Sequence, residues 1–294
     1  MSGRAAPWLG LPALALVFNA FTWGVSWWPF RALQAQGLHP LWATVLIYAL
    51  ALLVITAWRP RAWAQLWRAR SLWWLVAAAG ITNATFNWAV TLGDVVRVVL
   101  LFYLMPLWAV LLARALLGEA LTAAAGLRVA LALAGAAVVL WPTGGGLPVP
   151  ATPAEWLAVL GGFSFALNNV LLRREANQPE AARALAMFLG GALVAGVLAL
   201  SLGGHGSVPW PPAPAAGWLI GVALMGAWFL LGNLALQYGA ARLPANVTAV
   251  VMITEVLFAA VSALWLGAGT MSTSLLVGGG LIVGATLLSA RAAD

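Results

Sequence analysis

The sequence predicts an all-α membrane protein with ten transmembrane helices, and three observations support this fold class: the composition, the number of apolar runs and the placement of arginine. Of its 294 residues, 64% are hydrophobic and only 7% are charged, whereas an ordinary soluble domain has about 25% charged residues. Fourteen basic and seven acidic residues cannot cover the surface of a soluble protein of this length. The composition therefore excludes a soluble enzyme and a disordered chain.

The apolar runs predict how many helices cross the bilayer. A membrane-spanning helix needs about 20 apolar residues, so the chain has room for about ten of them and for no separate aqueous domain. Charged residues, prolines and glycine clusters separate ten such runs, at residues 8–30, 41–58, 71–92, 96–117, 121–141, 154–172, 182–203, 215–238, 245–267 and 272–290.

Arginine supplies the positive charge and lies almost entirely in alternate loops. One side of the predicted bundle has Arg31 and Arg97, and the other has Arg4, Arg59, Arg61, Arg68, Arg70, Arg114, Arg128, Arg173, Arg174, Arg183, Arg242 and Arg291. Cytoplasmic loops are enriched in positive charge, so both termini are expected in the cytoplasm. The net charge of +7 then reflects helix ends and not a nucleic-acid partner. In the basic loop 59–70, Trp63 and Trp67 favour a short helix at the membrane interface.

Several classes of chemistry are excluded by residues that the chain lacks. It has no cysteine and two histidines, His39 and His205, both in predicted loops. Thiol chemistry, cysteine-based metal sites and zinc-protease motifs are therefore ruled out. A nucleotide-binding P-loop needs a lysine, which the sequence also lacks. We expect no enzymatic activity, no cofactor and no metal.

The two halves of the chain resemble each other in short segments that follow the same order. Three pairs align, 21–31 with 163–173, 87–93 with 233–239, and 106–118 with 256–267. Because each half has five predicted spans, the second half must enter the membrane upside down. Inverted five-helix repeats over 1–145 and 146–294 are typical of transporters, whose halves open a midplane site alternately to each side. We therefore expect a central cavity between them.

The stretch NWAVTLGDVVRVVLLFYLMPLWAVLLARALLGEALT, at 87–122, resembles the end of the EamA-type repeat of the drug/metabolite transporter superfamily. Thr22–Gly24 is similar to the first-span motif of that family. In the second repeat, Val256 stands where the family often has proline, and Gly267–Ala268 where Gly-Glu is usual. With ALQYGAARLPANVTAV, at 235–250, the chain looks closest to bacterial aromatic amino acid exporters. The resemblance implies export of aromatic and other apolar amino acids across the bacterial inner membrane.

Polar residues inside the predicted spans are the candidate binding residues. Glu255 lies near the centre of the ninth span, where a carboxylate costs about 2.5–3.5 kcal/mol and usually faces a polar interior. It is a candidate contact for substrate or for a proton, and the alternative is a hydrogen-bonded packing residue. Asn83 and Asn87 share one helical face of the third span, and Asn233 and Gln237 repeat that spacing in the eighth. Such amides can bind a zwitterion without a buried full charge, or simply join helices within the lipid.

Aromatic residues could form the apolar wall of the same pocket. The candidates are Trp23, Tyr103, Trp228 and Tyr238, with Phe86 and Trp88 beside them. One of Asn168 and Asn169 is expected to line the cavity while the other packs. Pro106 should bend the fourth span as a kink, hinge or gate.

Further expectations concern the ends and the periphery of the bundle. Asp94 and Arg97 are expected to pair at the outer end of the fourth span. The fifth and tenth spans have few polar side chains, and small residues such as Gly135 and Gly278 mark close helix contacts there. These two spans are therefore expected at the periphery, with the other eight enclosing the path.

The functional hypothesis is a monomeric transporter in the lipid bilayer that exports an amino acid by alternating access, driven by the solute gradient or by an ion. The alternative within the same superfamily is efflux of cationic drugs, for which Glu255 would supply the carboxylate. An intramembrane enzyme is disfavoured because the spans contain no histidine, cysteine or aspartate that could act as base or ligand. A channel is disfavoured because no rings of charge or filter-like glycine runs are present.

Overall fold

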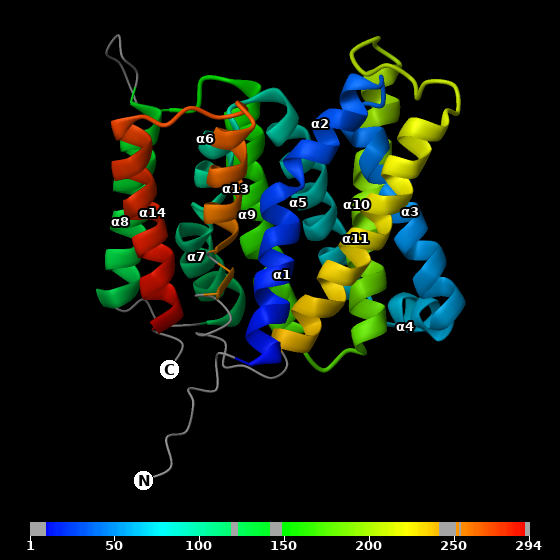
Figure 1. Cartoon of the computed structure of the whole chain (residues 1–294). Helices are drawn as coiled ribbons and strands as arrows, with labels where there is room; N and C mark the ends of the chain where they lie inside the picture. Colours follow the sequence, from blue (N-terminus) through cyan, green and yellow to red (C-terminus); the bar gives the residue numbers. More distant parts are fainter. Residues whose placement is uncertain (1–9, 119–122, 142–148, 241–250, 253, 292–294) are drawn as a thin grey trace.

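The structure is a computed structural model that describes residues 10–118, 123–141, 149–240, 251–252 and 254–291. Within these ranges every regular element is a helix (Figure 1). The helices are α1 Leu11–Val25, α2 Trp27–Ala35, α3 Pro40–Trp58, α4 Arg61–Arg68, α5 Leu72–Leu92, α6 Val95–Phe102, α7 Met105–Leu117, α8 Ala123–Leu140, α9 Pro153–Arg174, α10 Glu180–Gly203, α11 Ala216–Ala240, α13 Thr254–Trp265 and α14 Thr273–Arg291. The all-α class is confirmed for the described part of the chain.

Six helical stretches of the described residues are long and apolar enough to cross a membrane. They are α3, α5, α6 together with α7, α9, α10 and α11, and each coincides with an expected span. The other four expected spans contain α1 followed by α2, α8, α13 and α14. Three of these have a shorter apolar stretch of 10–17 residues. The chain thus has the helix lengths and composition of a multi-pass membrane protein.

Two of the expected spans are broken into two helices, and in both a proline sets the position of the break. α1 ends at Val25, four residues before Pro29, and α6 ends at Phe102, four residues before Pro106. Proline has no N–H to donate to the carbonyl four residues earlier, and its ring collides with that carbonyl. The fourth span is therefore interrupted where Pro106 predicts a bend, and the same rule explains the second break at Ser26.

The helices run alternately up and down between two ends of the molecule (Figure 1). The end drawn at the top, here called the upper end, has the loops that follow α2, α5, α10 and α13. The lower end has α4, the beginning of α1 and the end of α14. α8 and α14 pack against each other at one edge, as expected for peripheral helices. α1, α5, α9 and α13 lie between that edge and α3.

Glycines bring the central helices into close contact. A Cβ on Gly190 of α10 would overlap the backbone carbonyl of Val76 on α5, and one on Gly80 would overlap Gly190 in return. The same arrangement joins α8 to α14 at Gly135 and Gly278, where the sequence predicts it. Backbones that approach this closely gain van der Waals contact in lipid, where the hydrophobic effect does not hold helices together.

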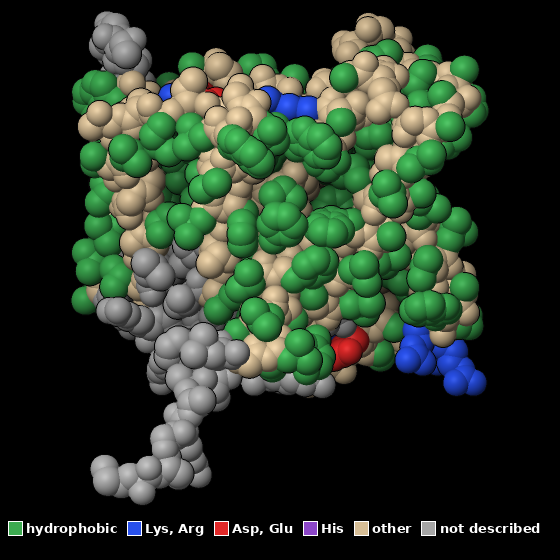
Figure 2. Space-filling model, viewed as in Figure 1, with side chains coloured by type: hydrophobic (Ala, Val, Ile, Leu, Met, Phe, Trp, Pro, Cys, Tyr) green, Lys and Arg blue, Asp and Glu red, His purple; other side chains and the backbone are tan. Residues whose placement is uncertain are grey.

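The surface separates apolar and charged side chains by height. Figure 2 shows hydrophobic side chains covering the face between the two ends, with the charged side chains near the ends. At the lower end, α4 buries Ala62 and Leu66 while Arg61, Trp67 and Arg68 remain exposed. α4 is therefore the amphipathic helix that loop 59–70 predicts.

Candidate functional site

A polar cluster joins α3 to α5 inside the bundle. The Tyr48 hydroxyl donates to the Asn83 amide oxygen at 2.5 Å, and the Asn87 amide nitrogen donates to the Thr44 hydroxyl oxygen at 3.0 Å. The cluster forms because both pairs are spaced four residues apart, so each pair occupies one face of its own helix. Tyr48 lies about 12 Å along α3 from its first residue, at 1.5 Å per residue, which places the cluster well inside the apolar layer.

Aromatic rings adjoin this polar cluster. The Tyr48 ring lies 5.3 Å from the Phe188 ring of α10 and 6.3 Å from the Phe229 ring of α11, edge-on to both. The Trp23 ring of α1 lies 4.7 Å from Phe229. Residues from α1, α3, α10 and α11 thus form an apolar wall beside the amides of α5. Thr44, Tyr48, Phe188 and Phe229 were not among the expected site residues, although the i, i+4 spacing of Thr44 and Tyr48 matches that of the two asparagines.

Besides that of Asn19 on α1, two buried amide oxygens have no hydrogen-bond partner among the described residues, namely those of Asn87 on α5 and Asn168 on α9. A buried acceptor without a partner costs about 1–3 kcal/mol, and folded proteins contain few of them. Asn168 is buried while Asn169 is exposed, so only the first faces the interior. Both oxygens are available to a donor on a bound molecule.

A second polar cluster joins α6 to α13. The Tyr103 hydroxyl, at the break between α6 and α7, donates to the Glu255 carboxylate at 3.0 Å. The Asn19 amide nitrogen of α1 lies 3.5 Å from the Met252 sulfur, and a Cβ on Gly24 would lie 2.8 Å from the Glu255 carbonyl oxygen. Glu255 and Tyr103 are both buried, so the carboxylate is shielded from lipid by α1 and α6.

The remaining candidates occupy different surroundings. Trp228 packs edge-on against Phe18 and Phe21 of α1, away from the cluster around Tyr48. Asn233 and Tyr238 are partly buried on α11, and each makes interactions there. The Gln237 side chain lies outside the described part of the structure. α11 packs on α1 and α3, and α5 packs on α9, α10 and α3, so α3 is a neighbour of both helices that carry the predicted amide pairs.

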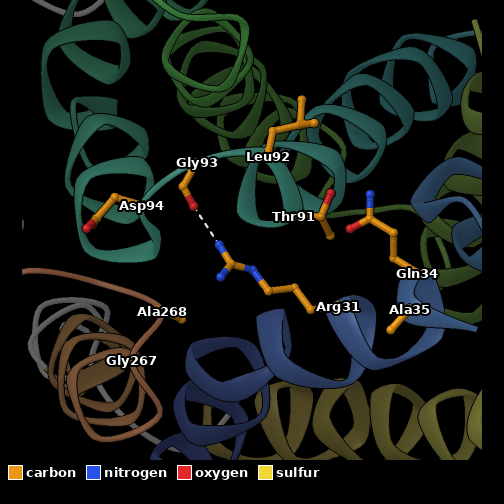
Figure 3. A pocket seen from close by; sticks show the side chains of 9 residues that line it. All are labelled: Arg31, Gln34, Ala35, Thr91, Leu92, Gly93, Asp94, Gly267 and Ala268. Atoms are coloured by element: carbon orange, nitrogen blue, oxygen red, sulfur yellow. Dashed lines mark hydrogen bonds between the residues drawn. The ribbon is translucent and has the colours of Figure 1, made fainter.

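Two open pockets lie at the upper end of the bundle and not at mid-height. The larger, of about 580 Å³, is lined by Arg31, Thr91 and Asp94 among others (Figure 3). The second, of about 420 Å³, adjoins it across Gly93 and Asp94 and reaches Glu155 at the start of α9. At mid-height, Tyr48 is hydrogen-bonded to Asn83 and Asn87 to Thr44, so the polar cluster is closed in this conformation. Neither of these two pockets is the expected central cavity, which stays a prediction.

The expected pairing of Asp94 with Arg97 is wrong for the two side chains. Asp94 caps the N-terminus of α6 by accepting from the Arg97 backbone N–H at 3.0 Å, and it accepts from the Thr270 backbone N–H at 2.7 Å. The Arg97 guanidinium instead pairs with Glu155 at 2.5 Å. A residue three positions into a helix presents its backbone N–H to the cap residue while its side chain turns outward, which leaves Arg97 free to reach α9.

We expect Glu155→Gln to lower the free energy of unfolding by about 2 kcal/mol, the value of charge-assisted hydrogen bonds. The Glu155 carboxylate pairs with Arg97 and also accepts from the Ala151 backbone N–H at 2.7 Å. Glu180→Gln is the matched control because Glu180 is exposed at the start of α10. Thermal unfolding of the purified protein measures both changes, and equal shifts in the two variants would contradict a structural role for the pair.

The chain matches known proteins in sequence over part of its length and in fold over nearly all of it. The EamA-like transporter family matches residues 10–141, from α1 to the end of α8. A comparison with curated proteins found no match.

Fifteen chains of solved structures match. One, described as "Crystal structure of protein", is 21% identical, covers 96% of this chain and 97% of its own, and has a TM-score of 0.57. At that identity the likeness concerns the fold alone. The family match confirms the resemblance to the EamA family for residues 10–141, and over that part the chain is similar to a family of transporters.

Proposed function

We propose that the chain is a drug/metabolite-type transporter that exports aromatic and other apolar amino acids by alternating access. The observation that carries this proposal is the spare Asn87 oxygen, which is buried beside hydroxyl groups and aromatic rings at mid-height. A zwitterion carries one ammonium and one carboxylate, and neutral amides and hydroxyls can bind both without a fixed charge that would be costly in lipid.

The chemistry of each group suggests how an aromatic amino acid would bind. The ammonium donates to the Asn87 oxygen, which has no partner among the described residues. The carboxylate accepts from the Tyr48 hydroxyl, which in the closed cluster donates to Asn83. The aromatic side chain packs against the rings of Phe188 and Phe229, where edge-on contacts between rings are favourable. Solute binding therefore exchanges internal hydrogen bonds for new ones.

The helix contacts support two inverted halves over 1–145 and 146–294. Inverted repeats pair each span of the first half with one span of the second. The pairs are α1/α2 with α9, α3 with α10, α5 with α11, α6/α7 with α13, and α8 with α14. Each contact between the halves should then have a counterpart. The contact of α5 with α9 corresponds to that of α11 with α1, and α7 with α9 corresponds to α13 with α1. If the two halves exchanged conformations, a site open to one side of the membrane would become open to the other side.

The arginine pattern supports an orientation in the inner membrane with the lower end in the cytoplasm. Arg59, Arg61, Arg68 and Arg70 are all exposed around α4 at that end, in agreement with the enrichment of positive charge in cytoplasmic loops. Both termini then lie in the cytoplasm and the two pockets open on the other side. A monomer suffices, because one chain carries both halves.

The experiment that tests this proposal is counterflow into liposomes that contain the purified protein. Liposomes preloaded with unlabelled phenylalanine should take up labelled phenylalanine, tryptophan and leucine in a saturable manner, and charged amino acids far more slowly. The rates with and without a pH gradient report whether amino acid transport is coupled to proton movement. Absence of saturable flux for every amino acid would contradict the substrate class.

Efflux of cationic drugs is the second candidate, and buried Glu255 is the observation that favours it. An ionised carboxylate attracts a cationic drug, whereas binding of a zwitterion does not require a charged side chain. If the substrate is an amino acid, Glu255→Gln should retain flux within about threefold, because the amide can still accept from Tyr103 and lost neutral hydrogen bonds are worth only about 0.5–1.5 kcal/mol. Loss of resistance to cationic drugs in that variant, with amino acid flux intact, would support the drug-efflux function.

A further inference from the structure

The larger pocket at the upper end has the features of a binding site, and it is separate from the polar cluster at mid-height. It lies between α2, the junction of α5 with α6, and the loop after α13 (Figure 3). Its volume of about 580 Å³ falls within the range of ligand pockets, about 300–1,000 Å³. Glycine and alanine at 93, 267 and 268 form part of its wall, so backbone lies close to any molecule inside it.

Arg31 is held in a fixed position at this pocket. Its Nε donates to the Val90 carbonyl at 2.9 Å and its Nη2 donates to the Gly93 carbonyl at 2.5 Å. The guanidinium carbon lies 5.4 Å from the centre of the Trp27 ring. Among the described residues none accepts a hydrogen bond from the other terminal nitrogen, Nη1. The guanidinium thus keeps one free edge in an open pocket.

The other polar groups of the pocket complement a carboxylate with an attached ammonium. Gln34 and Thr91 lie together on one side of Arg31, and Asp94 lies beyond Gly93 (Figure 3). Asp94 is fixed by the Arg97 and Thr270 backbone N–H groups, so its negative charge stays in place. A molecule here meets a positive and a negative charge at separate positions, together with neutral donors and acceptors.

We propose that this pocket is an exit site in which Arg31 binds the carboxylate of the transported amino acid before its release. The assignment rests on the proposed function for the direction of transport and names a second binding step at the upper end. A guanidinium binds carboxylates through short, charge-assisted hydrogen bonds. Because Asp94 lines the same pocket, the exit site selects for solutes that carry both a carboxylate and an ammonium.

The first test needs no transport. Phenylglyoxal modifies accessible arginines, and peptide mass spectrometry of the modified full-length protein measures the reaction at Arg31. We expect phenylalanine to slow modification of Arg31 and phenylalanine amide, which lacks the carboxylate, to leave it unchanged. Equal protection by both compounds, or by neither, would overturn the assignment.

The second test is the half-saturation concentration for phenylalanine added on the upper side in counterflow. Arg31→Gln should raise it about tenfold and Arg31→Lys less. Arg97→Gln should leave it unchanged, because that arginine faces Glu155. If Arg31 only caps α5, its variants would lower the melting temperature or the maximal rate and leave the half-saturation concentration unaltered, which would contradict the proposal.

The two tests separate failure of the exit site from failure of the proposed function. Saturable phenylalanine flux with no protection of Arg31 would remove the exit site and leave the function standing. Protection of Arg31 without flux of any amino acid would leave a carboxylate site and remove the export function.

Discussion

Gly190→Ala is expected to reduce the amount of folded protein and to lower flux about 100-fold. The added methyl group would overlap the Val76 carbonyl on α5, and a backbone carbonyl cannot rotate away as a side chain can. α5 and α10 would have to separate, at a cost of about 3 kcal/mol, the upper part of the range for overpacked cores. α5 also carries Asn83 and Asn87, so any remaining folded protein would have a displaced site, and misplacement by about 1 Å can reduce a rate about 100-fold.

Gly196→Ala is the matched control on the same helix. A Cβ at Gly196 would lie 3.5 Å from a Val45 methyl group, which is ordinary van der Waals contact. Thermal unfolding in detergent and counterflow in liposomes, measured on both variants, give the comparison. Similar melting temperatures and rates for the two variants would contradict the close packing of α5 on α10.

Asn87→Leu is expected to reduce phenylalanine flux by about 10- to 100-fold, the equivalent of a lost charge-assisted hydrogen bond worth about 1.5–3 kcal/mol. The same change should leave the melting temperature unaltered or raise it. Leucine has a similar volume and removes a buried oxygen that lacks a partner among the described residues. The Thr44 hydroxyl keeps its bond to the Pro40 carbonyl at 2.9 Å, so no new buried donor loses its partner.

Asn169→Leu serves as the control for this prediction because Asn169 is exposed on α9 and its oxygen accepts only one long hydrogen bond among the described residues, at 3.4 Å, from the Asn168 amide. Its flux and melting temperature should stay close to those of the unmodified protein. A packing role for Asn87 would produce the opposite pattern, with a lower melting temperature and normal kinetics. That result would exclude Asn87 from the binding site.

Local features of the fold follow from the sequence because they depend on neighbouring residues. The break before Pro106 results from a missing backbone donor, and the capping of α6 by Asp94 results from exposed N–H groups at a helix start. Small residues at helical spacing predict close helix contacts at Gly135 and Gly278, but not that these two glycines meet each other. Long apolar runs specify helices for the same reason, since each backbone group in lipid must be satisfied within its own segment.

The site is less predictable because it depends on which helices meet. Asn83 and Asn87 could be selected as polar residues on one face, but their partners Thr44 and Tyr48 are common residue types that acquire a role only when α3 packs on α5. The partner of Arg97 is Glu155, on a helix far along the chain, and no local pattern favours it over Asp94. The closed polar cluster is likewise a property of one conformation, which sequence patterns do not specify.

The central claim is that one solute site is reached alternately from the two ends of the bundle, and cysteine accessibility tests it most directly. The chain has no cysteine, so Val98→Cys, buried at the second upper pocket, and Leu16→Cys, buried toward the lower end of α1, each add a single reactive thiol. On addition of phenylalanine, we predict that the rates of maleimide labelling at the two positions change in opposite directions. Labelling that rises or falls together at both positions, while flux is saturable, would contradict alternating access.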